Sequence, residues 1–210
     1  KRESQPPTRV SSSMVLARTT PSVWVRTSRE RTCTSSCATT ASSSPGESAP
    51  MSAQKVVRIR RPRTGDFAAD ADAAATLYLA SRRATLPGLR DPHSAAETRA
   101  WMRDTAFARY SVRLAEVDGE IVAFAARDGA WLMQLYVMPE WTGRGIGSKL
   151  LELILAEAAA ATPILRLYTF ARNAGARRFY ERHGFVAVAF GDGTGNEEGE
   201  PDVRYERSTR

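Results

Sequence analysis

The pattern of hydrophobic and polar positions changes sharply near residue 56, and from there to the C-terminus it predicts a series of helices and strands. A short apolar run at 56–59 has the length of a strand. Residues 66–84 carry apolar side chains at the three- and four-residue spacing of a helix face. Ser94 is followed three residues later by Glu97, which is the capping-box signature of a second helix that we expect to run through Met102.

Three strands separated by tight turns are predicted next. The apolar runs cover 111–117, 121–126 and 131–137, and Asp-Gly pairs at 118–119 and 128–129 lie between them. An Asp-Gly pair between two apolar runs is a strong hairpin signal, because both central positions of the favoured turn have positive φ. We therefore expect three consecutive antiparallel strands.

The remaining residues alternate between helices and strands. Residues 145–161 predict a long helix with one apolar face, 164–170 a strand and 173–183 a helix. Residues 187–190 and 203–206 predict two final strands, joined by a loop over 191–201. This order predicts a mixed α/β sheet with helices on both of its faces.

Residues 1–50 differ in composition from the rest of the chain. They contain 20 Ser and Thr residues and few large apolar ones, so they cannot bury enough surface to offset the entropy lost on ordering. We expect a disordered extension over 1–50 and a folded domain over 51–210, with Met51 as the natural start. The Arg- and Ser-rich composition is alternatively that of an organelle-targeting peptide. Cys33 and Cys37 lack the second ligand pair of a zinc site, and we interpret them as incidental thiols.

Charge and hydropathy restrict the class of partner. The net charge is +7, of which residues 1–50 contribute +4 (seven basic and three acidic residues) and residues 51–210 contribute +3 (23 and 20). A nearly balanced domain suits a phosphorylated small-molecule ligand and argues against nucleic-acid binding. No apolar stretch reaches the ~18 residues that a membrane helix requires, so we expect a soluble, cytoplasmic protein without membrane contact.

A glycine-rich segment at 141–148 lies between a predicted strand and the start of a long helix. The N-terminus of a helix presents unpaired N–H groups and a partial positive charge, and glycines allow an anion to approach the backbone. The segment is neither a P-loop, since Gly147 is not followed by Lys-Ser/Thr, nor a Gly-x-Gly-x-x-Gly fingerprint. We predict that it binds a pyrophosphate; the alternative is that its glycines only shape a tight connection.

Two motifs occur in a recognisable order. The first is Leu135-Tyr136-Val137-x-Pro139-Glu140, followed by Gly143-Arg144-Gly145-Ile146-Gly147 and Leu150-Leu151. The second is Asn173-x-x-Ala176-x-x-Phe179-Tyr180-Glu181-x-x-Gly184-Phe185. Together they resemble the coenzyme A signature and the later motif of the GNAT superfamily of N-acetyltransferases, over about residues 56–207. The family loop is usually Gln/Arg-x-x-Gly-x-Gly/Ala; here Thr142 occupies the Gln/Arg position.

The resemblance implies a fold and a cosubstrate. The fold would have six to seven mostly antiparallel strands, about four helices and a central parallel pair that splays apart into a V-shaped slot. The cosubstrate would be acetyl-coenzyme A, with no metal. Its pantetheine arm would pair with the strand that ends at Val137, and its pyrophosphate would rest on the amides of the glycine segment. The implied binding residues are Leu135, Tyr136, Val137, Thr142, Gly143, Arg144, Gly145, Ile146, Gly147, Ser148, Asn173 and Tyr180.

Acetyl transfer to an amine needs a donor to the developing oxyanion and an acid for the leaving thiolate. We expect the donor to be a backbone N–H near Tyr136 or Val137 and the catalytic acid to be Tyr180; alternatively, Tyr180 only packs beside its neighbour on the helix.

The identity of the general base stays open. Many family members carry a carboxylate on the central strand, where this chain has Gln134. Candidates elsewhere are His93, Asp91, Glu197 and Glu198, each of which is alternatively an ordinary loop residue, and an amine can also lose its proton to water.

The expected function is an N-acetyltransferase that moves acetyl from acetyl-coenzyme A to a primary amine, on a small molecule or a peptide, by direct transfer in a ternary complex. The absence of cysteine from residues 51–210 agrees with a reaction without a covalent enzyme intermediate. The alternative is a non-catalytic acyl-coenzyme A sensing module. Two further sets of residues each allow two interpretations. An acceptor pocket or the core would contain Trp131 and Trp101. The adenosine 3′-phosphate would be bound by Arg172, Arg177 and Arg178, or these arginines form a polar helix face. A homodimer is compatible with the sequence, which does not identify the acceptor.

Overall fold

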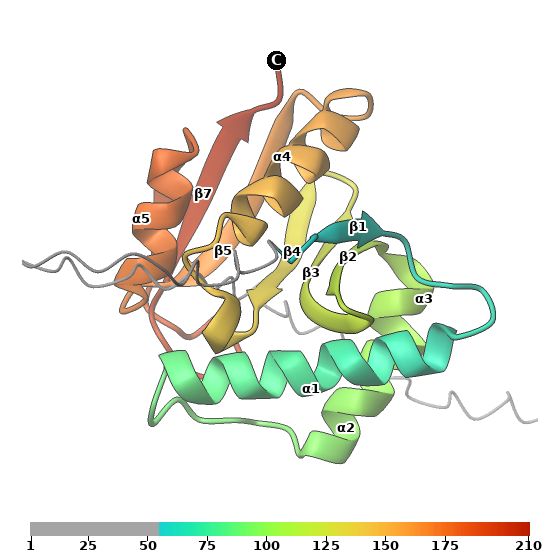
Figure 1. Cartoon of the computed structure of the whole chain (residues 1–210). Coiled ribbons are helices and arrows are strands. Elements are labelled where there is room, and N and C mark those ends of the chain that lie inside the picture. The colour runs from blue at the N-terminus through green and yellow to red at the C-terminus, as the bar shows by residue number, and fades with distance from the viewer. Residues whose placement is uncertain (1–54) are drawn as a thin grey trace, which may run out of the picture.

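A computed structural model describes residues 55–210, so the extension predicted at 1–50 and the two cysteines lie outside the described residues. The described chain forms one seven-stranded sheet flanked by helices (Figure 1). The strands are β1 (Arg58–Arg60), β2 (Ser111–Val117), β3 (Glu120–Asp128), β4 (Trp131–Val137), β5 (Ile164–Phe170), β6 (Val186–Gly191) and β7 (Asp202–Ser208). The helices are α1 (Phe67–Thr85), α2 (Ala95–Trp101), η1 (Met102–Ala106), α3 (Phe107–Arg109), η2 (Pro139–Trp141), α4 (Ile146–Ala159) and α5 (Ala174–Arg182).

The sheet has the strand order β1-β2-β3-β4-β5-β7-β6, and its one parallel contact among the described strands joins β4 to β5. That contact is confined to the pair Trp131 and Arg166, where the Arg166 N–H donates to the Ala130 carbonyl at 2.8 Å. The two strands are not paired beyond this point, so they separate toward their C-terminal ends. The predicted mixed sheet with a splayed parallel pair at its centre is therefore confirmed.

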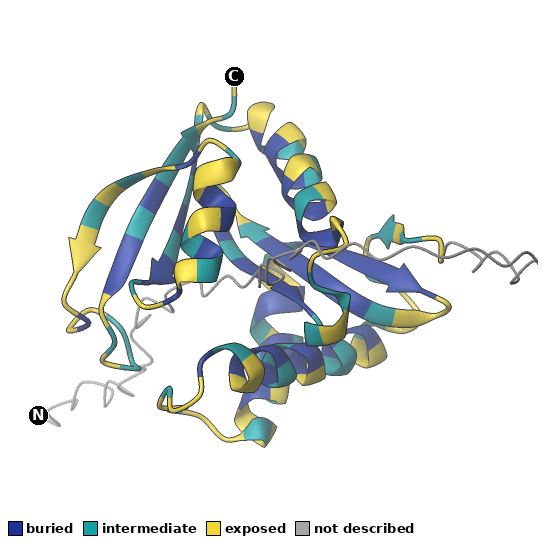
Figure 2. Ribbon diagram, turned by 60° about the vertical axis from the view of Figure 1, so that its left-hand side comes forward, coloured by how far each residue is buried: buried dark blue, intermediate teal, exposed yellow. Residues whose placement is uncertain are grey.

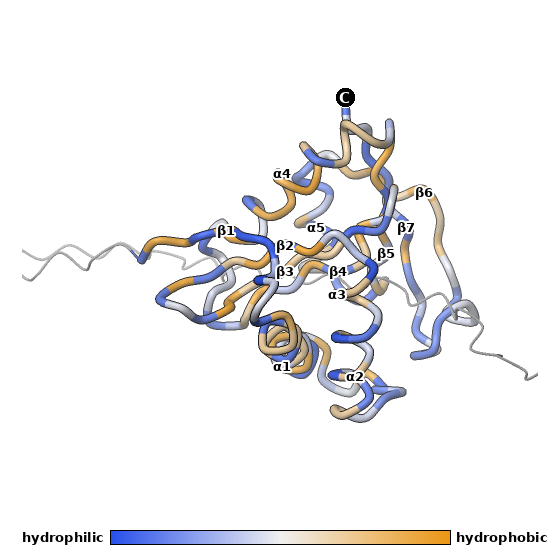
Figure 3. Tube along the Cα trace, turned by 90° about the vertical axis from the view of Figure 1, so that its right-hand side faces the viewer, coloured by the Kyte–Doolittle hydropathy of each residue, from blue (hydrophilic) through white to orange (hydrophobic). Residues whose placement is uncertain are grey.

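The sheet buries a hydrophobic core on each face (Figures 2 and 3). One core contains residues of α4 and α5 together with Leu135 and Val137 of β4. The other contains residues of α1, η1 and α3 together with Tyr136. Successive side chains of a strand point to opposite faces, which is why neighbouring residues of β4 belong to different cores. The side chains of β4 therefore contribute to the cores on both faces of the sheet.

Two expected boundaries differ from the structure. The capping box of α2 is confirmed, because the Glu97 N–H donates to Ser94 Oγ at 3.2 Å and the Ser94 N–H donates to Glu97 Oε2 at 2.8 Å. The helix does not end near Met102, however: it continues through the π-helical turn η1 and α3 to Arg109. Met102, Ala106 and Phe107 are buried against α1 and the sheet, and this tertiary burial sustains the extra turns.

The first strand is also shorter than expected. Pairing with β2 begins at Arg58 rather than at Val56, whose side chain is 79% exposed. At the opposite edge, β6 pairs only with β7, and most of its residues are exposed or half-buried (Figure 2). Among residues 55–210, no helix is both long and apolar enough to span a membrane.

Candidate active site

The backbone of β4 faces two different neighbours. The Met138 N–H donates to the Val122 carbonyl at 2.8 Å, and Tyr136 lies opposite Phe124 in the same ladder. Because alternate residues of a strand direct their N–H groups to opposite edges, the N–H of Tyr136 points to β3, whereas those of Leu135 and Val137 point toward the gap beside β5. Of the two oxyanion donors that we expected, the structure therefore excludes Tyr136 and leaves Val137.

The glycine segment forms the start of α4, as predicted. Gly143 and Gly145 have φ values of 75° and 78°, and Gly145 is the N-cap of the helix. No side chain caps α4, so the first N–H groups of the helix are not satisfied by a capping residue. A Cβ built on Gly145 would meet no heavy atom of residues 55–210 within 4 Å, so the N-cap position is open in this part of the chain. Uncapped amides, a helix dipole and open space are the properties of an anion site.

The side chains around this loop hold its shape. The Thr142 hydroxyl donates to the Pro139 carbonyl at 2.8 Å, and the Arg144 guanidinium lies 4.6 Å from the centre of the Trp141 ring. Ser148 Oγ lies 3.0 Å from His183 Nε2, and His183 Nδ1 lies 2.7 Å from the Phe179 carbonyl oxygen. Since a carbonyl only accepts, His183 Nδ1 carries the proton and, in the neutral ring, Nε2 accepts from Ser148. This contact joins the first turn of α4 to the last turn of α5.

Tyr180 extends from α5 into the core that also contains Leu135 and Val137 of β4, and its ring contacts those of Phe179 and Phe185 at 5.3 and 5.4 Å between centroids. The residue is fully buried, and its hydroxyl has no hydrogen-bond partner among residues 55–210. Burial, with a smaller contribution from the Tyr136 phenol, raises the pKa of Tyr180 well above its usual range. The phenol is therefore a protonated donor at neutral pH, and a buried hydroxyl without a partner costs free energy that a ligand can recover.

Asn173 has a local structural role. Its Oδ1 accepts from the Ala176 N–H at 3.0 Å and so caps α5, and its Nδ2 donates to Thr169 Oγ1 at 3.3 Å. A hydrogen bond from Asn173 to a cofactor arm remains a prediction. The polar cap nevertheless explains why an Asn occurs at this position of the sequence motif.

The four candidate bases come together from two loops that are distant in the sequence. Asp91 and His93 lie between α1 and α2, and Glu197 and Glu198 lie between β6 and β7. His93 Nε2 is 2.7 Å from Glu197 Oε2. Asp91 and Glu198 both pair with Arg82 of α1, whose Nη2 is 3.3 Å from Asp91 Oδ1 and 3.1 Å from Glu198 Oε1. The loop over 191–201 is therefore tied to α1 and its neighbouring loop.

These features coincide with a match to a protein family. Residues 75–185 match the model of the acetyltransferase (GNAT) family, which is more than half of the chain. The chain belongs to the GNAT acetyltransferase family.

Individual relatives agree with this assignment. An uncharacterized N-acetyltransferase from Archaeoglobus fulgidus is 38% identical over 81 residues, which cover 33% of this chain and 55% of the relative. The chain thus spans about half the length of this curated relative.

Two solved structures share the fold. The apo form of YjaB from Escherichia coli has 22% identity and a TM-score of 0.58, covering 72% of this chain and 97% of its own. The PaiA N-acetyltransferase from Thermoplasma acidophilum in complex with coenzyme A has 21% identity and a TM-score of 0.53, covering 73% and 99%.

Most of the remaining candidates have structural contacts of their own. Trp131 stacks on Tyr168 with parallel rings 5.3 Å apart, and Trp101 contacts Tyr110 at 6.4 Å. Arg172 pairs with Glu200 at 3.2 Å, and Arg177 donates to the Tyr205 hydroxyl at 3.2 Å. Arg172 and Arg177 thus have structural contacts, and binding of the 3′-phosphate by any of the three arginines remains a prediction. Gln134 is buried, and its Oε1 has no hydrogen-bond partner within residues 55–210.

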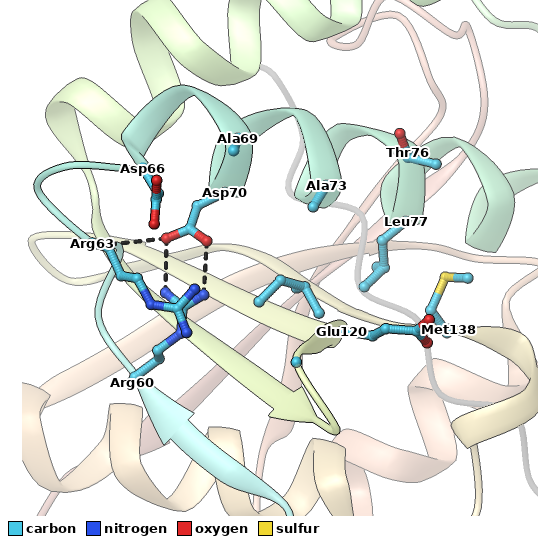
Figure 4. Close-up of a pocket in the computed structure, with 12 residues that line it drawn as sticks. Arg60, Arg63, Asp66, Ala69, Asp70, Ala73, Thr76, Leu77, Glu120 and Met138 are labelled. Carbon is cyan, nitrogen blue, oxygen red and sulfur yellow. Dashed lines mark hydrogen bonds and ion pairs between the residues drawn. The ribbon is translucent and has the colours of Figure 1, made fainter.

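A cavity of about 470 Å³ lies along the first half of α1 and extends to Met138 (Figure 4). Three of its charged lining residues, Arg60, Arg63 and Asp70, are held in ion pairs. Arg60 donates to both oxygens of Asp70 at 2.7 Å and to Glu116 at 2.6 Å, and the Arg63 N–H donates to Asp70 at 2.9 Å. These contacts connect β1, α1 and β2, so we assign them a structural role.

Sequence reasoning missed two residues of the site region. Arg82 is followed by Arg83 near the end of a helix, where basic residues are common because they complement the helix dipole. His183 likewise has the position of an ordinary C-terminal helix residue. Neither offers a local signal, since each acquires its partner from another part of the chain.

Proposed function

We propose that this protein is an N-acetyltransferase that moves the acetyl group of acetyl-coenzyme A to a primary amine by direct attack in a ternary complex. One observation carries the proposal: the uncapped N-terminus of α4 opens next to the strand whose Val137 N–H faces the gap between β4 and β5. An anion site and an unpaired strand edge are what a diphosphate joined to an extended amide arm requires.

The residues fit the cosubstrate, which supplies the acetyl group as a thioester. The first amides of α4 would hold its pyrophosphate, because Gly145 places no side chain in front of them. The edge of β4 that faces the gap, with the N–H groups of Leu135 and Val137, would pair with the pantetheine arm as a further strand would.

Three groups of the chain would act on the reacting atoms. As the amine nitrogen bonds to the thioester carbon, the Val137 N–H would donate to the carbonyl oxygen, on which negative charge develops. As the carbon–sulfur bond breaks, Tyr180 would transfer its phenolic proton to the sulfur; the phenol is protonated at neutral pH, and burial keeps it in that form until the thiolate develops. Asp91 and Glu198 are paired with Arg82, so we assign removal of the amine proton to His93, with Glu197 as its partner. When His93 donates from Nε2 to Glu197, Nδ1 is the basic nitrogen.

The test compares thiol release from acetyl-coenzyme A across a panel of amines with calorimetric binding of coenzyme A. We expect Tyr180→Phe to lower turnover by about 10²-fold or more, the usual contribution of a positioned acid, and to leave coenzyme A affinity within about threefold. Tyr205→Phe is the matched control, because Tyr205 belongs to the same core but its hydroxyl donates to Glu181 at 2.8 Å.

The outcomes separate the alternatives. Unchanged turnover in Tyr180→Phe would refute the role of the acid. Binding of coenzyme A without thiol release for any amine would favour a non-catalytic sensing module. No binding of coenzyme A at all would refute the proposed function, whichever amine is tested.

A further inference from the structure

Arg82 is a buried cation whose donors are only partly used. Its side chain is 3% exposed and lies 5.3 Å from the centre of the Tyr78 ring. Both of its ion pairs involve Nη2, with Glu198 at 3.1 Å and Asp91 at 3.3 Å. The Nε and Nη1 atoms have no hydrogen-bond partner among the described residues. An arginine of this kind retains donors that a ligand can satisfy.

Arg127 and Arg204 each leave only Nε buried without a hydrogen-bond partner among the described residues, whereas Arg60 and Arg113 use all three of their side-chain nitrogens. All three side-chain nitrogens of Arg60 donate to oxygens, of Glu116, Arg61 and Asp70. Those of Arg113 donate to Glu157 and to the Val112 carbonyl, with Nε and Nη1 each at 2.8 Å from their acceptor. Because a buried charged donor without an acceptor is costly, the unpaired donors of Arg82 indicate a role beyond stability.

Arg82 lies beside the core residues Tyr78 and Tyr136 and the two loops that contain Asp91 and Glu198. Tyr136 of β4 adds to the upward shift of the Tyr180 pKa, after burial, and its own ring packs on that of Tyr78 at 4.8 Å between centroids. Burial alone would lower the pKa of Arg82, and Tyr78, Tyr136, Glu198 and Asp91 outweigh it, so that the net shift is upward. Arg82 thus packs on the Tyr78 ring, which contacts the Tyr136 ring, and its Nη2 pairs with Asp91 and Glu198 of the two loops.

We propose that Arg82 binds the carboxylate or carbonyl oxygen of the acceptor, and that the acceptor is an amino acid or the N-terminal residue of a peptide. The inference rests on the proposed function, because it places this oxygen beside the amine that is acetylated. Nε and Nη1 supply the hydrogen bonds, while the acidic side chains around Arg82 attract the ammonium group and disfavour a second anionic group on the acceptor. A plain alkyl polyamine satisfies the acidic side chains but leaves both donors of Arg82 unpaired.

The experiment uses matched sets of three acceptors: an amino acid, its amide, and the amine in which hydrogen replaces the carboxyl group. The kcat/KM for thiol release is measured for wild type, Arg82→Lys and the control Arg83→Lys, which makes the same change at an exposed neighbouring position. We expect wild type and Arg83→Lys to prefer the first two acceptors by about tenfold or more, because a site built to hydrogen-bond an oxygen rejects an analogue that lacks it. In Arg82→Lys, which keeps the charge but loses the Nε and Nη1 donors, this preference should disappear.

A second variant keeps the proposal testable if Arg82→Lys does not fold. Glu198→Gln removes a competing negative charge from Arg82 without touching the guanidinium, so we expect the preference for the amino acid over its amide to increase. Equal use of all three acceptors by wild type, or a preference that survives in Arg82→Lys, would overturn the proposal. A polyamine used better than every amino acid would do the same.

Failure of the proposed function is distinguishable from failure of this inference. If coenzyme A binds but no amine is acetylated, the proposed function fails, and the role of Arg82 is then decided by thermal unfolding in the presence of coenzyme A. The amino acid, but not its decarboxylated analogue, should raise the Tm of wild type and of Arg83→Lys but not that of Arg82→Lys. Absence of this shift would overturn the assignment of Arg82.

Discussion

Replacement of Gly145 by Ala provides a quantitative test of the anion site at the start of α4. Gly145 has a φ of 78° and is the N-cap of the helix, and its added Cβ would meet no heavy atom within 4 Å. The cost to folding is therefore that of the backbone alone, about 1–2 kcal/mol for a non-glycine residue in the left-handed region. If the first amides of α4 hold a phosphate, as we propose, the methyl group should hinder its approach to the N-cap. We expect the Kd for coenzyme A to rise about tenfold, which corresponds to about 1.4 kcal/mol.

Gly119→Ala is the matched control for this change. Gly119 has a φ of 87° in the turn between β2 and β3, and a Cβ there also has no neighbour within 4 Å. Urea unfolding should show a similar loss of stability in both variants, whereas calorimetry should show weaker binding of coenzyme A only for Gly145→Ala. If the two variants bound coenzyme A equally well, the diphosphate would not rest on the amides of α4, and the reasoning that assigns the site would be wrong.

Two further predictions concern the scaffold. Asp70→Asn leaves Arg60 without its two-point carboxylate partner at a nearly buried position, so we expect the free energy of unfolding in urea to fall by about 3 kcal/mol. The hydrogen bond from Arg60 outweighs desolvation and lowers the pKa of Asp70, so the pair stabilises the fold fully above the unfolded-state value of about 3.9 and loses its effect as the pH falls through the lower folded-state pKa. The acid-induced loss of stability should therefore be smaller in Asp70→Asn, and an unchanged acid limb would contradict this. Ser94→Ala removes the cap of α2 and should cost about 1 kcal/mol, with faster hydrogen exchange in that helix; unchanged exchange would show that the cap does not stabilise it.

The order of helices and strands was predictable because its signals are local. The Asp-Gly pairs lie at the turns between β2, β3 and β4, and the helical periodicity of 145–161 contains α4. Errors occurred where burial outweighed local signals. The helix that begins after Ser94 continues to Arg109 because Phe107 packs into the core, and nothing near Met102 in the sequence announces this. The short strand at the N-terminal edge shifted to Arg58 because its register depends on β2.

Some features of the candidate site were likewise encoded in local sequence, and others depend on contacts between distant parts of the chain. The glycine segment was recognisable because a backbone conformation and a helix start are encoded within a few residues, and Gly145 indeed has positive φ. The proposal of Val137 rather than Tyr136 as oxyanion donor depends on the hydrogen-bond register between β3 and β4, which the sequence of β4 alone does not give. The role of Tyr180 as an acid was suggested by its motif, and the structure adds the burial that raises its pKa.

The sequence by itself determined the elements, the turns between them and the glycine-rich start of a long helix, because each depends on residues within a few positions of one another. Only the tertiary structure decided which polar groups meet. His93 and Glu197 are 104 positions apart and become partners through the approach of two loops. Arg82 resembles any basic residue near a helix end until folding buries it beside Glu198 and leaves two of its nitrogens without acceptors. Burial and pairing are properties of the packed chain, and they are what convert an ordinary arginine into a candidate specificity residue.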